Sequence, residues 1–492
     1  MRNWALRSGV VSMTTNPAIE NDLSVPLCVD LDGTLIASDL LWESFCAMLR
    51  SQPASLAMIP FWLMRGRAAL KHEIASRGNV DPTVLPYRAE VLSLIASERD
   101  LGRKVVLATA ADGQLAHAVA EHLGIFDEVI ASDGENNLKG SAKRLALEAR
   151  FGAMGFDYVG DSAADLSVWK SARRAYVVMT HPRVISEAER ERPIHRVGAP
   201  AGGFALGLFK ALRPHQWAKN SLLLVPLITS HRLLEPWLLL QILIALATFN
   251  LTASAVYIVN DLLDLQADRR HRTKRNRPFA SGKVPIPVGG AAAVALLVLG
   301  VAGSLLLPAT FTGLLLLYLA VTTAYSWILK RKPMADVVCL AGLYSLRIFA
   351  GGAAVGVSIS PWLIAFSMFF FLSLAFAKRY TEIEALPTAD AHVANRGYRA
   401  PDLELIRAMG PACGLLSVLV FCLYINSPDI RLLYRRPELL WLSCPFLLYW
   451  IGRLWLFAGR GALNDDPVIF AIHDGESYLT GAAMGLILLL SV

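Results

Sequence analysis

The hydrophobic positions of this chain follow two patterns that meet near residue 205. In the first part, short apolar runs alternate with segments of ordinary charge density, which is typical of alternating strands and helices. From about residue 218, apolar runs of roughly membrane-spanning length recur to the end of the sequence. We expect about nine transmembrane helices, at residues 219–231, 237–260, 287–307, 309–329, 335–354, 361–377, 407–426, 438–457 and 477–492.

The change of pattern predicts two domains of different fold class. The first is a soluble α/β domain with a Rossmann-like parallel sheet, and the second is an all-α polytopic membrane domain. A short segment rich in Gly and Ala lies between them. The expected boundaries are a tail at 1–23, the α/β domain at 24–197, a linker at 198–206 and the membrane domain at 207–492.

Composition and charge support a membrane location. Of the 492 residues 54% are hydrophobic and 18% are charged, which is too apolar for a soluble protein of this size. Basic residues crowd alternate loops between the predicted spans, at 269–283, 330–332 and 378–399. By the positive-inside rule these loops are cytoplasmic, as is the N-terminal domain. We therefore expect a multi-pass protein of the inner (cytoplasmic) membrane, with its active sites on the cytoplasmic side.

The formal net charge of +7 is explained by this topology and by the anionic headgroups of the lipid bilayer, so no nucleic-acid partner is expected. Six cysteines are scattered without a CxxC pair, which indicates neither a disulfide framework nor a zinc site. The N-terminus lacks the charged and apolar regions of a signal peptide.

Two aspartates follow the first apolar strand of the N-terminal domain, in Pro26-Leu-Cys-Val-Asp-Leu-Asp-Gly-Thr-Leu35. Alternation along the strand end leaves Asp30 and Asp32 on the same side. One carboxylate of such a pair can attack a phosphoryl group while the other protonates the leaving oxygen. Both are also candidate ligands of Mg²⁺.

Further polar residues end later apolar strands of the same domain. Thr109 closes Val105-Val-Leu-Ala-Thr109, and Asp161 and Asp165 lie in Tyr158-Val-Gly-Asp-Ser-Ala-Ala-Asp165. Either Lys139 or Lys143 supplies a cation. Because the carboxyl ends of parallel strands meet at one edge of a sheet, these residues predict a phosphate and Mg²⁺ site.

With these four motifs the segment 24–185 resembles the haloacid dehalogenase-like (HAD) phosphatase superfamily. The resemblance implies Asp30 as the phosphoryl-accepting nucleophile and Asp32 as the general acid/base. It also implies Thr109 and Lys139 as phosphate-binding residues, with Lys143 as the rival for the lysine role. Asp161 and Asp165 would anchor Mg²⁺. A catalytically silent domain that kept this fold is the alternative.

The resemblance also implies a helical cap inserted after the first motif, at about residues 40–100. This segment contains an apolar run, Ala54-Ser-Leu-Ala-Met-Ile-Pro-Phe-Trp-Leu-Met64. We expect the run to form the core of the cap, with contact to the bilayer as the alternative. Its short length and Pro60 argue against a membrane span.

In the membrane domain, carboxylates gather at the end of a long apolar run, in Tyr257-Ile-Val-Asn-Asp-Leu-Leu-Asp-Leu-Gln-Ala-Asp268. Asp261, Asp264 and Asp268 lie on one face of a helix. Carboxylates this close repel one another unless a cation neutralises them, and hard oxygen ligands favour Mg²⁺. The sequence therefore predicts a metal-diphosphate site at the membrane surface, with Asp261 and Asp264 as catalytic residues. A solvated helix end is the alternative.

The order Asn260-Asp261-x-x-Asp264-x-x-x-Asp268 resembles the first aspartate-rich motif of the UbiA superfamily of intramembrane prenyltransferases, over about residues 207–492. Three further segments resemble its decaprenyl-phosphate phosphoribosyltransferase branch. They are Leu212-Arg-Pro-His-Gln-Trp-Ala-Lys-Asn220, Asp268-Arg-Arg-His-Arg-Thr-Lys-Arg-Asn-Arg-Pro278 and Ala377-Lys-Arg-Tyr-Thr-Glu382. That branch takes phosphoribosyl pyrophosphate as donor and a polyprenyl phosphate as acceptor.

A donor with a phosphate and a diphosphate needs cations around it. The candidate substrate-binding residues of the membrane domain are Lys219, Asn260, Arg270, Lys274, Arg275, Arg277, Arg347, Lys378 and Arg379. Arg347 stands out because it lies in the middle of a predicted span, where a guanidinium is costly unless it faces a polar cavity or a carboxylate. We expect Asp336 or the acceptor phosphate to be its partner.

These features predict a membrane-embedded, Mg²⁺-dependent transferase. The lipid phosphate would attack the anomeric carbon of phosphoribosyl pyrophosphate, and the fused phosphatase would remove the 5-phosphate of the product. The first alternative is a prenyltransferase with a prenyl diphosphate donor and a small aromatic acceptor, beside a HAD domain with a separate or regulatory role. A transporter or anchor is the second, although its carboxylates would be expected near the midplane.

Overall fold

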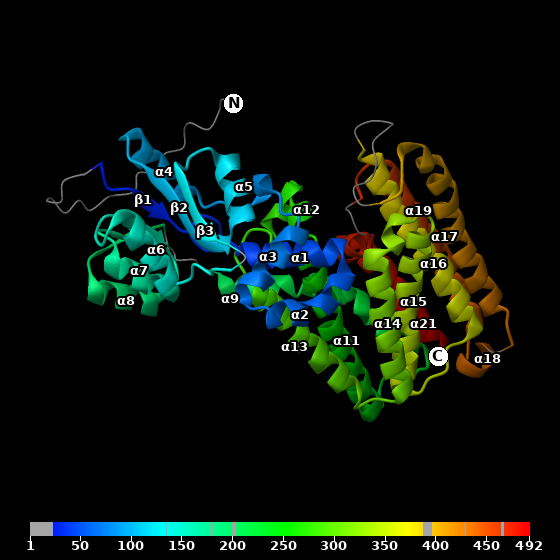
Figure 1. The fold of residues 1–492 in the computed structure, drawn as a ribbon. Coiled ribbons are helices and arrows are strands. Elements are labelled where there is room, and N and C mark those ends of the chain that lie inside the picture. Colours follow the sequence, from blue (N-terminus) through cyan, green and yellow to red (C-terminus); the bar gives the residue numbers. More distant parts are fainter. Residues whose placement is uncertain are drawn as a thin grey trace. The chain divides into compact units, whose positions relative to one another are not determined.

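The computed structural model describes residues 23–133, 135–178, 181–198, 203–386, 396–428, 430–463 and 467–492. The chain divides into two compact units, Met1–Gly202 and Gly203–Val492. Figure 1 shows a sheet with surrounding helices in the first unit and long helices in the second. The predicted combination of a parallel α/β domain and a helical membrane domain is therefore confirmed.

The N-terminal unit contains one sheet of six parallel strands in the order β3-β2-β1-β4-β5-β6. The strands are β1 (Leu27–Val29), β2 (Val105–Asp112), β3 (Glu128–Ser132), β4 (Asp157–Gly160), β5 (Ala175–Val178) and β6 (Ile194–Val197). Because β1 and β4 are central neighbours, the carboxyl ends of both strands meet at the middle of the sheet. This is the edge at which the predicted site residues follow their strands.

Helices cover both faces of the sheet, and successive residues of β1 contribute to different apolar layers. Leu27 and Val29 belong to one buried cluster, whereas Cys28 belongs to another. This alternation follows from the two-residue period of a strand. The helices that follow strands or precede them are α4 (Ala89–Asp100), α5 (Gly113–Leu123), α6 (Ser141–Phe151), α7 (Leu166–Ser171) and α8 (Pro182–Glu191), with the short 3₁₀ turns η2 (Pro82–Val84) and η3 (Ala163–Asp165).

The cap is helical, as expected, and consists of α1 (Leu40–Ser51), η1 (Pro53–Met58), α2 (Ile59–Met64) and α3 (Arg67–Arg77). Its small core contains Met48, Trp62 and Ile74. The expectation that the whole apolar run at 54–64 fills this core is wrong. Only Trp62 of the run is fully buried, because one turn of helix cannot direct more of these side chains inward.

In the second unit, seven helical segments of the described residues are long and apolar enough to cross a membrane. The chain is therefore an integral membrane protein. The segments are Pro236–Leu263, Ile286–Ser304, Ala309–Trp327, Ala335–Val355, Pro361–Glu384, Ala400–Ile425 and Pro437–Gly459. They match seven of the nine expected spans. The expected first span is instead broken into two short pieces, and the expected last one is a helix of 17 residues.

The membrane unit begins with α9 (Phe204–Ala211), followed by η4 (Pro214–Leu224) and α10 (Val225–Thr229). Its remaining elements are α11 (Pro236–Leu263), α12 (Leu265–Arg270), η5 (Lys274–Asn276), α13 (Ile286–Ser304), α14 (Ala309–Trp327), η6 (Leu329–Arg331), α15 (Ala335–Val355), α16 (Pro361–Glu384), η7 (Ala400–Asp402), α17 (Leu403–Ile425), α18 (Ile430–Leu433), η8 (Pro437–Leu442), α19 (Ser443–Gly459), α20 (Pro467–His473) and α21 (Gly475–Ser491).

A close backbone approach fixes η4 against α15. A Cβ atom at Gly351 would collide with the carbonyl oxygen of Leu223. Small residues let helices in membranes approach to this distance. The contact brings the polar residue Asn220 of η4 into the interior of the membrane unit, where it is buried.

Candidate functional site

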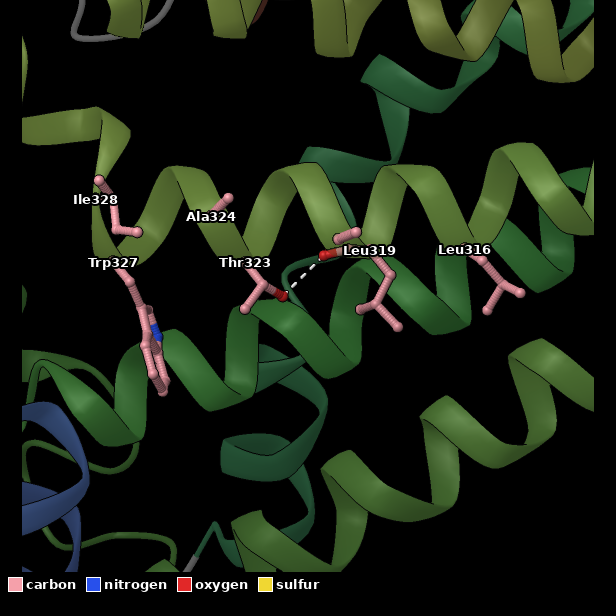
Figure 2. Close-up of a pocket in the computed structure, with 7 residues that line it drawn as sticks. Leu316, Leu319, Thr323, Ala324, Trp327 and Ile328 are labelled. Atoms are coloured by element: carbon pink, nitrogen blue, oxygen red, sulfur yellow. Dashed lines mark hydrogen bonds between the residues drawn. The ribbon is translucent and has the colours of Figure 1, made fainter. Parts of the chain in front are cut away.

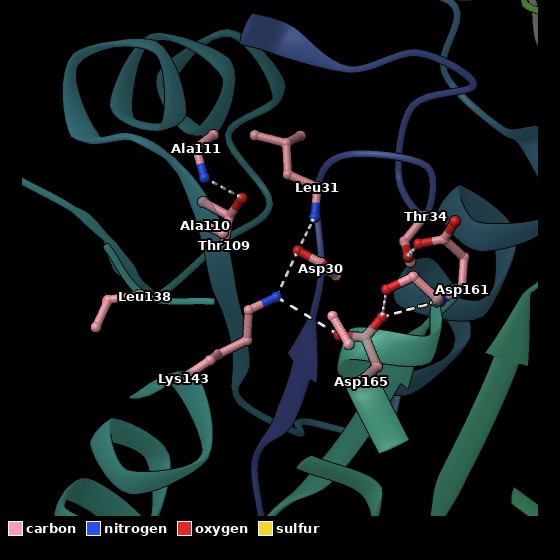
Figure 3. Close-up of polar contacts among 12 residues, drawn as sticks. Asp30, Leu31, Thr34, Thr109, Ala110, Ala111, Leu138, Lys143, Asp161 and Asp165 are labelled. Atoms are coloured by element: carbon pink, nitrogen blue, oxygen red, sulfur yellow. Dashed lines mark hydrogen bonds and ion pairs between the residues drawn. The ribbon is translucent and has the colours of Figure 1, made fainter. Parts of the chain in front are cut away.

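Three carboxylates of the N-terminal unit converge at the carboxyl ends of β1 and β4 (Figure 3). Asp30 follows β1, Asp161 follows β4, and Asp165 ends η3. One oxygen of each lies within 4.8 Å of the others. Three hard oxygen donors at this spacing suit a cation such as Mg²⁺, so the residues present fit the metal that the sequence predicts here.

The turn after β1 is shaped to admit the Asp161 side chain. A Cβ atom at Gly33 would collide with the Asp161 carboxylate, and Gly33 has a φ of +76°, which favours glycine. Thr34 donates a hydrogen bond of 3.1 Å from Oγ1 to Asp161 Oδ1. The Gly-Thr pair of the first motif therefore positions a residue that lies far away in the sequence.

The lysine of this site is Lys143. Its Nζ lies 2.9 Å from Asp30 Oδ1 and 3.7 Å from Asp165 Oδ1, and the side chain is buried in α6. Lys139, which we preferred from the sequence, precedes α6 and is exposed. The structure therefore brings Lys143, the rival, and not Lys139 into contact with the carboxylates. The reason is the helix start, because only the first turn of α6 directs a lysine toward β1.

Asp32 follows β1, whereas Thr109 lies within β2, three residues before its end, so the expectation that Thr109 closes its strand is wrong. Both residues lie outside the carboxylate group. Asp32 Oδ1 accepts a hydrogen bond of 2.8 Å from the backbone N–H of Leu40, at the start of the cap. Thr109 is fully buried in β2, and its Oγ1 accepts a bond of 3.0 Å from the N–H of Ala111. Asp32 was also predicted as a metal ligand, and the structure does not place it among the three clustered carboxylates.

The electrostatics of the site favour binding of a cation. Burial raises the pKa of Asp30 to about 6, although Lys143 opposes the rise. Burial, followed by the charges of Asp165 and Asp30, raises the pKa of Asp161 to about 7. Burial opposes the charged form of Lys143, but the charges of Asp30 and Asp165 outweigh it and raise its pKa. The carboxylates thus carry unbalanced negative charge once they ionise.

Sequence reasoning missed three contributors to this site. Tyr158 accepts a hydrogen bond from Lys143 and donates one to Asp165, at 2.8 and 2.9 Å. Lys71 of the cap helix α3 donates to the carbonyl oxygen of Ala110 at 2.8 Å. Arg88 donates to the carbonyl oxygen of Gly33 at 3.0 Å. Tyr158 begins the motif that contains Asp161, so its position was a usable signal, whereas no local pattern identifies the other two.

In the membrane unit, arginines hold the predicted aspartates at the end of α11. Asp261 is buried and forms ion pairs with Arg213 and with Arg277, the latter at 3.1 Å. Arg277 also lies 2.6 Å from Asp268. Buried carboxylates need such partners. The two arginines come from segments before and after α11, so the site joins both of the flanking motifs.

Asp264 faces a different cation, with its Oδ2 3.9 Å from Lys330 Nζ. Among the described residues, Asp261, Asp264 and Asp268 do not form a group whose oxygens approach one another as those of the N-terminal unit do. Oxygen donors that suit Mg²⁺ are present, but Arg213 and Arg277 already bind them. The expected repulsion among these aspartates is relieved by Arg213, Arg277 and Lys330.

Arg347 is buried in α15, and Asp336, one of its two expected partners, is not among its contacts. Its Nε donates to Asn220 Oδ1 at 2.8 Å, and Nη1 donates to the carbonyl oxygen of Leu343 at 2.5 Å. The guanidinium carbon lies 5.0 Å from the ring centre of Tyr318 and 5.7 Å from that of Tyr344. Amide and aromatic partners thus stabilise the charge within the span.

The expected pairing of Arg347 with Asp336 is therefore wrong, because Asp336 belongs to a second ion network. Asp336 Oδ2 lies 2.8 Å from Arg379 Nε, and Tyr398 donates to Asp336 Oδ1 at 2.5 Å. Arg379 also pairs with Glu382. Arg379 is 1% exposed, so the network joins the ends of α15 and α16 and encloses a residue that the sequence assigned to substrate binding.

The other candidate substrate-binding residues differ in exposure. Lys219 is half-buried, and its Nζ lies 5.9 Å from the ring centre of Tyr344, which Arg347 also contacts. Asn260 and Lys378 are half-buried as well. The exposed members are Arg270, Lys274 and Arg275. Lys219 is thus the member of this set that shares an aromatic ring with Arg347.

A shallow, open apolar groove of about 470 Å³ runs along α14, and its lining residues belong to this helix or, in Ile328, directly follow it. Figure 2 shows the side chains of Leu316, Leu319 and Trp327 along one side of this helix. The polar group of Thr323 is hydrogen bonded to the carbonyl oxygen of Leu319 at 2.8 Å. The groove ends at Ile328, two residues before Lys330, which pairs with Asp264.

Comparisons with known proteins find a matching family for each of the two units. The UbiA prenyltransferase family model matches residues 221–472, just over half of the chain. The haloacid dehalogenase-like hydrolase model matches residues 27–170. The uncharacterized protein y4nM of Sinorhizobium fredii is 38% identical and covers 94% of this chain and 90% of its own length.

Two further relatives match part of the chain. Nodulation protein NoeC of Azorhizobium caulinodans is 32% identical over 57% of this chain and 92% of its own length. Decaprenyl-phosphate phosphoribosyltransferase of Corynebacterium glutamicum is 37% identical over 37% of this chain and 57% of its own length. The chain thus aligns with little more than half of that enzyme. On these matches, the chain belongs to the UbiA prenyltransferase family and carries an N-terminal haloacid dehalogenase-like hydrolase domain.

Proposed function

We propose that the membrane unit transfers a 5-phosphoribosyl group from phosphoribosyl pyrophosphate to a polyprenyl phosphate. The observation that carries this proposal is the 37% identity with a decaprenyl-phosphate phosphoribosyltransferase. The end of α16 supports it, because Lys378-Arg-Tyr-Thr-Glu382 stands there instead of the second aspartate-rich motif that is usual in UbiA members with aromatic acceptors. The arginines around Asp261 also suit a donor with many phosphate oxygens.

The residues at the end of α11 have different roles in binding the donor. Asp261 and Asp264, with help from Asp268, would hold Mg²⁺, which supplies charge neutralisation to the diphosphate leaving group. Arg213 and Arg277 turn from Asp261 to the phosphate oxygens. An oxygen of the lipid phosphate forms the new bond to the anomeric carbon, and the bond from that carbon to the diphosphate breaks with its electron pair. The acceptor is already anionic, so no general base is required.

The groove on α14 is the proposed site of the polyprenyl chain. Its lining is almost entirely apolar, and it ends beside the segment that carries Lys330. A lipid seated there would direct its phosphate toward Lys330 and Asp264 rather than into the hydrocarbon region. Lys330 would balance the charge of that phosphate while the tail stays among Leu and Trp side chains.

We further propose that the N-terminal unit removes the 5-phosphate of the product. Asp30 attacks the phosphorus atom, and Asp32 protonates the leaving oxygen of the ribose. Water then hydrolyses the aspartyl phosphate and releases inorganic phosphate. Lys143 holds Asp30 in place, and the Asp30–Asp161–Asp165 group provides the Mg²⁺ ligands.

The test is pyrophosphate release by the full-length protein in lipid nanodiscs with Mg²⁺, phosphoribosyl pyrophosphate and a polyprenyl phosphate. We expect release that requires both substrates and is lost in Asp261→Asn. Glu404→Gln is the matched control, because Glu404 is an exposed carboxylate at the start of α17. No release with this donor, together with turnover of a prenyl diphosphate, would replace the proposal by the prenyltransferase alternative.

A further inference from the structure

An exposed apolar face on the cap has no counterpart in the chemistry proposed above. It consists of Leu56, Met58, Phe61, Leu63 and Met64, in η1 and α2. Phe61 is 62% exposed and Met64 is 85% exposed. Soluble domains rarely expose several large apolar side chains side by side unless they contact another surface. We call these five residues the cap face.

The cap face is positioned by residues on its inner side. Trp62 is buried against Met48 and Ile74, and the guanidinium of Arg77 lies 4.7 Å from its ring centre. Helix α2 packs on α3 and η1 on α1 (Figure 1). Because Trp62 occupies the small core, its neighbours in the same helical turn point outward. Exposure of the cap face thus follows from the packing of the cap itself.

The charge around the cap face matches an anionic lipid surface. No Asp or Glu occurs between Glu43 and Glu73, whereas this segment contains Arg50, Arg65 and Arg67. Arg65 and Arg67 directly follow the cap face and are exposed, and Arg65 also pairs with Glu73 at 3.0 Å. Apolar side chains bordered by cations are typical of segments that lie in the interface of a bilayer.

The short connection between the two units is the second argument that the cap face binds lipid. From Gly198, at the end of the described part of the N-terminal unit, to Gly203, where the membrane unit begins, the chain can extend at most about 18 Å. The N-terminal unit is thus always tethered to an integral membrane protein. Because the bilayer is always close to the N-terminal unit, even weak binding of this unit to the bilayer interface is sufficient to dock it.

We infer that the cap face inserts into the interface of the bilayer and docks the N-terminal unit on lipid. The connection between α2 and α3 is short, because it consists of only Arg65 and Gly66. Helix α3 carries Lys71, which contacts the carbonyl oxygen of Ala110 at the strand ends of the phosphatase site. Docking therefore places the strand ends of that site near the headgroups, where a phosphate carried by a lipid is found.

The experiment measures the environment of the cap face in the full-length protein. An environment-sensitive fluorophore is attached to Phe61→Cys in nanodiscs of zwitterionic and anionic phospholipid. Cys339 and Cys422, the two native cysteines that are not buried, are replaced by Ser. The matched control is the same label at Leu145→Cys, an exposed apolar residue of α6 in the same unit. Brominated phospholipids then test for direct contact with acyl chains.

We expect blue-shifted emission and quenching by brominated lipid at position 61, and neither at position 145. Emission that is blue-shifted but not quenched would show that a protein surface covers the cap face, and would overturn the inference. Unshifted emission would overturn it as well. The readout needs no substrate, so it stays informative if the proposed phosphoribosyl transfer fails.

Discussion

Lys143 shows how the N-terminal site depends on single side chains. It contacts Asp30 and Asp165 from a buried position, whereas Lys139 is exposed outside α6. We expect Lys143→Ala to lower phosphate release by the full-length protein about 100-fold or more, as is typical when a preorganised charge at a reacting group is removed. Lys139→Ala should retain most of the activity. Equal losses in both variants would contradict the assignment of the lysine role.

Lys143 also shows the limit of sequence reasoning at this scale. The motifs around Asp30 and Asp161 were found because each is contiguous and directly follows a strand, so their convergence follows from a parallel sheet. The choice between two lysines depends on where α6 begins, which a chain of mixed polar residues at 133–143 does not reveal. Arg347 was identified because a guanidinium within a span is energetically costly. Its partner Asn220 lies far away in the sequence, so the sequence did not reveal the pair.

The raised pKa values of Asp30 and Asp161 predict a pH-dependent response to metal removal. Both lie above the ordinary aspartate value, at about 6 and about 7, so protonation favours the folded state. Without divalent cations this stability is present below about pH 4 and is lost as the pH rises through 6 to 7. Mg²⁺ binds the ionised carboxylates and should restore more stability at pH 8 than at pH 5.5.

Hydrogen–deuterium exchange of the full-length protein measures this effect at β1 and β4. After correction for the intrinsic pH dependence of exchange, Mg²⁺ should protect these strands more at pH 8. Peptides from α17 serve as the internal control, because they lie in the membrane unit. Protection that is equal at both pH values would mean that these two carboxylates do not couple metal binding to folding.

Among the elements, the contact between η4 and α15 positions the interior of the membrane unit. Gly351 lies against the carbonyl oxygen of Leu223, whereas a Cβ atom at Gly342, on the same helix, would meet nothing within 4 Å. We expect Gly351→Ala to destabilise the protein by about 1–3 kcal/mol through overpacking. Gly342→Ala should be neutral or slightly stabilising. Thermal unfolding in one detergent compares the two, and equal midpoints would contradict the close approach.

The elements also differ in how well the sequence predicted them. The helices α11 and α16 were clearly predicted, because each is a long apolar run that begins with Pro, and both the periodicity and the length of the run indicate a helix. The first expected span, 219–231, was wrong in detail: residues up to Leu224 form η4, and α10 begins at Val225 and ends at Thr229. Pro226 and the preceding polar segment break the helix, and apolar length alone does not register such a break.

At the level of the whole molecule, the covalent connection of two candidate active sites has a measurable consequence. If one chain performs both proposed steps, its own N-terminal unit meets the product first. We expect a mixture of Asp30→Asn protein and Asp261→Asn protein, in separate nanodiscs, to release phosphate from the lipid-linked product more slowly than unsubstituted protein. Mixing the same two variants within shared vesicles should recover part of the rate. Equal rates in all three samples would show that the connection gives no advantage.

The outward-facing residues of α2 also affect how the protein can be handled. A fragment that ends before residue 203 would carry Phe61 and Met64 into water without a bilayer beside them. Such a fragment is expected to self-associate as its concentration rises, and detergent should disperse it. Kinetics measured on it would then report the state of aggregation as much as the chemistry of Asp30, so a lipid environment is the appropriate setting even for the water-facing half of this chain.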